Sequence, residues 1–115
     1  MGPLMIYLGI ILFLLGQTLG WFQLNAQSFS EYWKDKALLS AVIMGVPTSV
    51  LFWYGWKYVV EETGSAWTAR FIASCAGLII FPILTWAILG ESMFTTKTMV
   101  CLGLTVAIML IQLFW

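Results

Sequence analysis

The chain has 115 residues, of which 62% are hydrophobic and 9% are charged, and its formal net charge is zero. A soluble domain usually has about a quarter charged residues, so this chain has too few polar groups to cover a water-facing surface. The balanced charge and the lack of a basic stripe also argue against nucleic-acid binding. The composition therefore predicts a membrane protein.

Four apolar segments are long enough to cross a bilayer as helices. A helix rises about 1.5 Å per residue, so a hydrocarbon core of about 30 Å needs roughly 20 mostly apolar residues. The segments that meet this condition are approximately residues 3–22, 37–60, 66–89 and 98–115. Aromatic residues gather near their ends, including Trp115 at the end of the last one, where amphipathic rings prefer the headgroup region. We expect one all-α domain of four transmembrane helices.

The first segment contains Gly16 and Gly20 in a GxxxG pattern, and Gln17 is its only strongly polar residue. Small residues let membrane helices approach closely, so the glycines predict a packing face, within this chain or with another. An amide in lipid needs a partner, so Gln17 is predicted to join two helices or to contact a ligand. No lysine or arginine precedes the apolar run, which favours a retained span over a cleaved signal peptide.

The connection over residues 23–36 is expected to contain a short helix. Ser28 and Glu31 have the spacing of a capping box, and Phe29, Tyr32 and Trp33 share one helical face. The alternative is an aromatic-rich loop that lies on the membrane surface.

Prolines interrupt the second and third segments. Pro47 follows Gly45 by two residues, and Pro82 lies deep in the third segment. A proline inside a helix removes one backbone hydrogen bond, which predicts either a static kink or a hinge between alternating conformations.

Arg70 is the only charged residue clearly inside a predicted span, about four residues into the third segment. Membrane-embedded charges usually face the interior of the bundle and often mark a substrate pathway. Alternatively, Arg70 extends to the interface or pairs with Glu61 or Glu62. Arg70 lies on the helical face that has the small and polar residues of this segment. This face consists of Trp67, Arg70, Ala73, Ser74 and Gly77.

The fourth segment offers Gly103 and Ala107 as a second small-residue face. The chain has no histidine, and all five acidic residues lie outside the predicted spans, so the buried titratable group common in proton-coupled transporters is missing. The sequence also lacks a nucleophile–base pair, a metal cluster and a phosphate-binding loop. We therefore expect no enzyme activity, catalytic residue, metal or cofactor.

The order of several motifs carries a family resemblance. They are residues 6–9 (IYLG), 16–19 (GQTL), 62–67 (ETGSAW) and 84–91 (LTWAILGE). With four spans, short loops and little charge bias for orientation, the chain resembles the small multidrug resistance proteins and the wider drug/metabolite transporter superfamily. The resemblance implies a four-helix unit in a bacterial-type inner membrane that pairs as a homodimer, often antiparallel. It also implies that the first three helices line a chamber and the fourth makes the dimer contact.

This interpretation assigns roles to individual residues. The chamber would be lined by Arg70, Gln17, Trp67, Tyr54 and Ser74. Pro47 and Gly45 would form a hinge, and Gly103 and Ala107 would form the dimer face.

Three positions depart from the family pattern. The family's helix-one glutamate aligns near Phe13 or Leu15, and its helix-two tyrosine aligns near Pro47, whereas Trp67 falls where an aromatic residue is expected. Arg70 stands where the family has an apolar or aromatic residue. Because a cation would repel cationic drugs, we expect an anionic or neutral solute. The alternative is a non-transporting accessory subunit of a larger membrane complex.

Overall fold

The computed structural model describes residues 3–114, which form helices and no strand. Four of its helical stretches are long and apolar enough to cross a membrane, and this confirms the predicted all-α architecture. These stretches are Leu4–Phe29, Ala37–Thr63, Ala66–Leu89 and Thr96–Phe114. Trp115, expected at the end of the last span, lies outside the described residues.

Two of the four stretches are not uniform α-helices. The first and last are continuous, as α1 (Pro3–Phe29) and α5 (Thr96–Phe114). The second consists of α2 (Ala37–Ser40), the π-helical η2 (Ala41–Gly45) and α3 (Val46–Thr63). The third consists of α4 (Ala66–Leu84) and the π-helical η3 (Thr85–Leu89).

α1 is longer than the sequence predicts, because it continues to Phe29 instead of ending near residue 22. Asn25 and Gln27 donate side-chain hydrogen bonds to carbonyls of the same helix, so these polar residues continue the helix instead of forming a loop. The proposed capping box at Ser28 is wrong, because Ser28 lies inside α1. The predicted short helix is reduced to one 3-10 turn, η1 (Glu31–Trp33).

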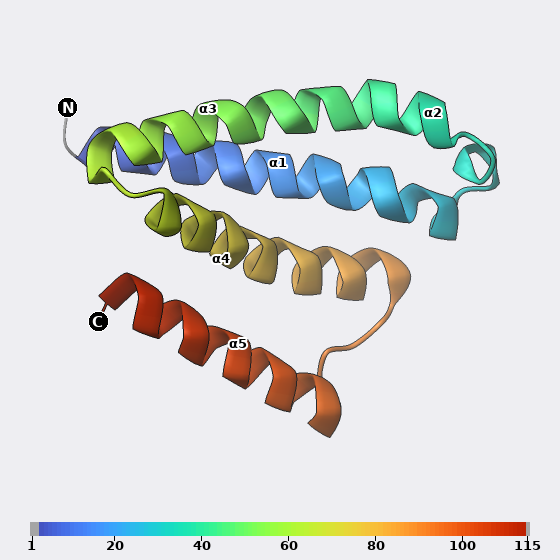
Figure 1. Cartoon of the computed structure of the whole chain (residues 1–115). Helices are drawn as coiled ribbons and strands as arrows, with labels where there is room; N and C mark the ends of the chain where they lie inside the picture. The colour runs from blue at the N-terminus through green and yellow to red at the C-terminus, as the bar shows by residue number, and fades with distance from the viewer. Residues whose placement is uncertain (1–2, 115) are drawn as a thin grey trace.

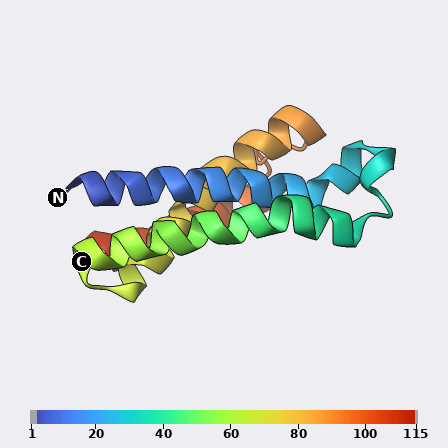
Figure 2. The same ribbon diagram turned by 90° about the horizontal axis from the view of Figure 1, so that it is seen from above.

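The helices form a flat arrangement rather than a closed bundle. Figure 1 shows α1 and α3 side by side and antiparallel, with α4 next to α1 and α5 beyond α4, and Figure 2 shows the same pairing of α1 and α3 from above. The Cα positions span 45 × 36 × 17 Å. The beginning of α1 and the end of α5 lie at the same end of the molecule in both views.

Close backbone approach holds α1 against α3. A Cβ atom on Gly9 would lie 3.1 Å from the Gly55 carbonyl oxygen, and one on Gly55 would lie 3.2 Å from the Gly9 carbonyl oxygen. Toward the other end of α1, Gly16 packs on the Phe52 ring and Gly20 faces the Thr48 methyl group. The glycine face predicted on the first helix therefore packs within the same chain.

The core of the molecule is small and lies where α1, α3 and α4 meet. Phe13 of α1 and Val59 of α3 are fully buried there. α4 contributes only alanines to this cluster, which lets its backbone come close to both neighbours. These alanines are Ala69, Ala73 and Ala76.

A tight turn between α3 and α4 fixes the start of the third stretch. Gly64 has φ +72°, a left-handed conformation that glycine adopts without steric cost, and its N–H bonds the Val60 carbonyl. Ser65 then caps α4 by accepting a hydrogen bond from the Thr68 N–H.

α5 packs on α4 with one face and leaves the opposite face open. Gly103 and Ala107 are exposed, and no atom outside their own helix lies within 4 Å of a Cβ built on Gly103. The less exposed residues follow a helical spacing on the other face, and they are Thr98, Leu102, Thr105, Met109 and Leu113. The two predicted dimer-face residues therefore point away from the face that meets α4.

Candidate solute-binding site

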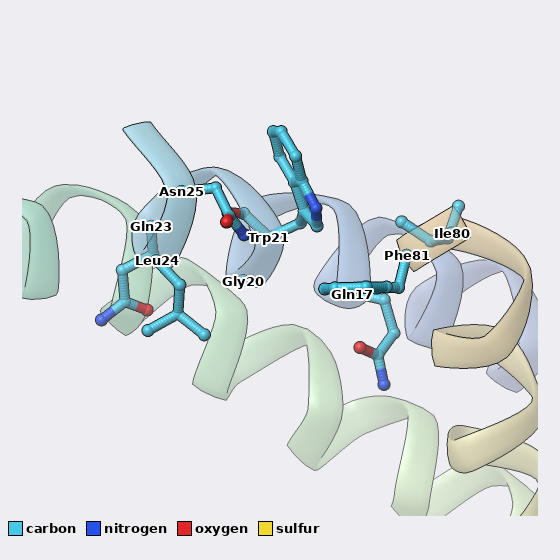
Figure 3. Close-up of a pocket in the computed structure, with 8 residues that line it drawn as sticks. All are labelled: Gln17, Gly20, Trp21, Gln23, Leu24, Asn25, Ile80 and Phe81. Atoms are coloured by element: carbon cyan, nitrogen blue, oxygen red, sulfur yellow. The ribbon is translucent and has the colours of Figure 1, made fainter. Parts of the chain in front are cut away.

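A hollow of about 240 Å³ lies between the second half of α1 and the end of α4. Six of its lining residues belong to α1 and two to α4, and all of them are labelled in Figure 3. None of these residues is ionisable, and three carry side-chain amides, so the hollow has a mostly apolar wall with a few polar groups. They are Gln17, Gly20, Trp21, Gln23, Leu24, Asn25, Ile80 and Phe81.

Gln17 ties α1 to α4 at one end of this hollow. Its Nε2 donates a 3.1 Å hydrogen bond to the Ala73 carbonyl oxygen. The amide lies directly over Gly77, because a Cβ at that position would come within 3.1 Å of Nε2. Glycine therefore makes the space that the amide fills. Among residues 3–114, no group donates a hydrogen bond to the Gln17 Oε1 atom.

Trp21 makes a second polar link between α1 and the third stretch. Its indole Nε1 donates a 3.0 Å hydrogen bond to the Thr85 hydroxyl, and both side chains are buried. Asn25, one turn further along, donates from Nδ2 to the Trp21 carbonyl oxygen at 3.0 Å. Two of the three amides around the hollow and the indole N–H are thus held by helix-to-helix and within-helix bonds.

Both π-helical segments meet α1 at this same level. Thr85, the partner of Trp21, is the first residue of η3, and Gly45, the last residue of η2, lies against the Gln23 amide. The Ser40 hydroxyl also donates to the Gln23 carbonyl oxygen at 3.0 Å. π-turns are uncommon and often occur at functional sites, so their position beside the hollow supports a role for this region.

The predicted hinge residues lie at the end of η2. The Val46 N–H bonds the Ala41 carbonyl, five residues back, which places the π-turn directly before Pro47. Pro47 is the second residue of α3, a position that tolerates a missing N–H. The irregularity expected around Gly45 and Pro47 is therefore a π-turn, and hinge motion stays a prediction.

The other predicted chamber residues lie elsewhere. Arg70 is exposed, and no carboxylate among the described residues forms an ion pair with it. The Ser74 hydroxyl donates to the Arg70 carbonyl within α4, and Trp67 is 68% exposed. Tyr54 is exposed on α3, where its ring neighbours that of Tyr58. The structure brings Gln17 to the hollow and leaves these four residues off its wall.

Sequence reasoning missed most of the residues that form the wall. Trp21 follows Gln17 by one helical turn, which was an available signal for a shared face. Gln23 and Asn25 fell in the predicted loop, and Ile80 and Phe81 have no sequence signal that separates them from lipid-facing residues.

The Trp21–Thr85 hydrogen bond is expected to stabilise the fold by about 1 kcal/mol. Thr85→Val removes the acceptor with little change in shape, and Trp21→Phe removes the donor together with part of the buried ring volume. Detergent-titration unfolding of the two single variants and the double variant gives the coupling energy. Strictly additive losses would show that the bond contributes no stability.

Comparison with known proteins yields no relative: no protein-family model, no curated protein and no solved structure matches the chain.

Proposed function

We propose that the chain is an integral membrane protein whose four long helices cross the bilayer. Large apolar side chains are exposed along every one of these helices, whereas buried apolar residues are few among the described residues. A water-soluble monomer rarely exposes contiguous apolar patches larger than a few hundred Å². In lipid the same surface is satisfied, because the outward side chains contact acyl chains.

We further propose that α1, α3 and α4 form a small transporter-like unit that moves an uncharged solute. The hollow between α1 and α4 carries this proposal, because its wall is mostly apolar and includes three amide side chains. Binding sites for small molecules usually have this composition. The hollow is smaller than the typical range of roughly 300–1,000 Å³, so it suits a small solute.

The uncharged wall favours a neutral solute over an anionic one. The anionic alternative depended on Arg70 facing the chamber, and Arg70 is exposed and off the wall of the hollow. A charge that enters a low-dielectric site without a partner has a large desolvation penalty. We therefore retain Gln17, rather than Arg70, as the proposed solute contact.

We propose that two copies pair through the open face of α5. Gly103 and Ala107 lie one turn apart on that face, and a Cβ on Gly103 would meet no atom, so a second helix has room to approach. The same open face would serve an accessory subunit that packs in a larger complex. Purification in mild detergent separates the two: a homodimer weakened by Gly103→Leu supports pairing, and a constant foreign partner supports the subunit.

The transport proposal is tested by solute flux into proteoliposomes. Stopped-flow light scattering follows the re-swelling of vesicles after a jump in the concentration of a neutral or an anionic solute of similar size. We expect faster entry of the neutral solute with the protein than without it, unchanged entry in Arg70→Ala, and loss of the protein-dependent entry in Gln17→Leu. Gln112→Leu, which changes an exposed amide on α5, is the matched control.

Loss of flux in Arg70→Ala with normal flux in Gln17→Leu would restore the anion pathway and overturn the choice of the hollow. Equal flux with and without protein for every solute would remove transport altogether.

A further inference from the structure

The hollow between α1 and α4 has a hydrogen-bonding pattern that restricts the solute further. Gln17 and Asn25 each donate one side-chain N–H to a backbone carbonyl oxygen. A carbonyl oxygen only accepts, so the amide nitrogen has to face it in each case. This assignment fixes where the Oε1 of Gln17 and the Oδ1 of Asn25 are.

These two amide oxygens receive no hydrogen bond from any residue between 3 and 114. The indole N–H of Trp21 is the one aromatic donor of the wall, and it is already bound to Thr85. The other wall residues on α4, Ile80 and Phe81, offer only apolar surface.

The wall also has donors, because the Gln17 and Asn25 amides each keep a second N–H and the Gln23 side-chain amide makes no hydrogen bond within residues 3–114. A solute that fills the hollow therefore has to supply donors for the amide oxygens and acceptors for these N–H groups, because unpaired polar groups are costly once water is displaced.

We propose that this hollow binds a small uncharged solute with an apolar carbon body and hydroxyl or amide donor groups. A donor would reach Gln17 Oε1 or Asn25 Oδ1, which lie eight residues apart on α1, and the carbon body would contact Leu24, Ile80 and Phe81. A carboxylate would bring a negative charge to a wall that has no cation, and the loss of its hydration would have no compensating ion pair. This inference rests on the proposed transport site but concerns binding, which is measured without flux.

Three four-carbon probes separate the chemistry. 1,4-Butanediol has two donors, its isomer 1,2-dimethoxyethane has the same atoms and no donor, and 4-hydroxybutyrate keeps one hydroxyl but adds a negative charge. Saturation-transfer NMR on the full chain in lipid nanodiscs, with empty nanodiscs as blank, reports binding of each. We expect the diol to bind more strongly than the other two probes, because it alone is uncharged and has both donors and acceptors. Binding of the diether as strong as that of the diol, or stronger binding of the carboxylate, would overturn the proposal.

Two variants locate the binding. Asn25→Leu removes one acceptor without touching another helix, because Asn25 bonds only its own helix, and we expect the diol to bind about three- to tenfold more weakly. Gln27→Leu is the matched control: Gln27 also bonds a carbonyl of α1, the Leu24 oxygen, but is exposed and off this wall. Gln17→Leu is measured as well, with helicity by circular dichroism as a check on folding.

Unchanged diol binding in folded Asn25→Leu and Gln17→Leu would overturn the assignment of these oxygens. If the protein binds the diol and Asn25→Leu abolishes this binding, but the protein gives no diol flux into proteoliposomes, the site is supported and transport is contradicted. Flux that does not distinguish the diol from the diether would leave transport standing and contradict this inference.

Discussion

Replacing Gly55 with leucine is expected to separate α1 from α3 and to lower the free energy of unfolding by about 3 kcal/mol or more. A Cβ alone would lie 2.9 Å from the Phe13 ring and 3.2 Å from the Gly9 carbonyl oxygen. The Gly9 carbonyl belongs to the backbone of α1, so it cannot rotate away as a side chain could. The two helices must therefore move apart. Reversible unfolding by detergent titration, followed by far-UV circular dichroism, measures the loss.

Gly103→Leu is the matched control for this variant. It makes the same chemical change inside a long helix, but at a position with open space around it. Measured at dilutions where the chain is monomeric, so that the proposed α5 dimer contact does not contribute, the free energy of unfolding is expected to change by less than about 0.5 kcal/mol. Equal losses in the two variants would show that leucine acts through helix propensity or insertion rather than through the α1–α3 contact.

Introducing a glutamate at Phe13 is expected to destabilise the chain by about 3 kcal/mol or more, because Phe13 is 0% exposed and the described residues packed around it include no cation. The resemblance suggested by the sequence would place the helix-one glutamate of the small multidrug resistance proteins near Phe13 or Leu15. In this chain the Phe13 ring packs against Gly55, and the centroids of the Phe13 and Phe52 rings are 5.9 Å apart. A carboxylate there would be buried without a partner.

Phe13→Leu keeps the site apolar and is expected to cost less than half of that amount. Thermal and detergent unfolding of both variants give the comparison. A stable Phe13→Glu protein that binds a cationic drug would contradict this view of the core and revive the position as a substrate site. Leu15 cannot serve as a buried substrate site within the monomer, because its side chain is 51% exposed on the outside of α1.

The four long helices were predictable because a span is a property of some twenty consecutive residues, and single exceptions hardly alter it. The ends of these helices were harder to predict from the sequence. Asn25 and Gln27 look like loop residues by composition, yet each bonds a carbonyl of its own helix and extends α1. The π-turns were also hidden, because one extra residue in a turn changes neither composition nor hydropathy.

The site was predictable only in part, for a related reason. Gln17 was predictable because a polar residue in an apolar segment needs a partner, and the structure provides the Ala73 carbonyl. Arg70 drew attention by its charge, but charge does not fix which side of a helix faces its neighbours. Ile80 and Phe81 are apolar residues in an apolar helix, so only the packing of α4 on α1 shows that they line the hollow.

The uncharged wall of the hollow has a consequence for the energetics of any rocking between α1 and α4. Moving one elementary charge across a membrane potential changes its electrostatic energy by about 2.3 kcal/mol per 100 mV. The wall residues include no ionisable side chain, and the proposed solute is neutral, so the occupied hollow itself would carry no charge through the field, whereas Arg70, elsewhere on α4, would move with that helix. The direction of net flux would then follow the concentration gradient of the solute in polarised and depolarised vesicles alike.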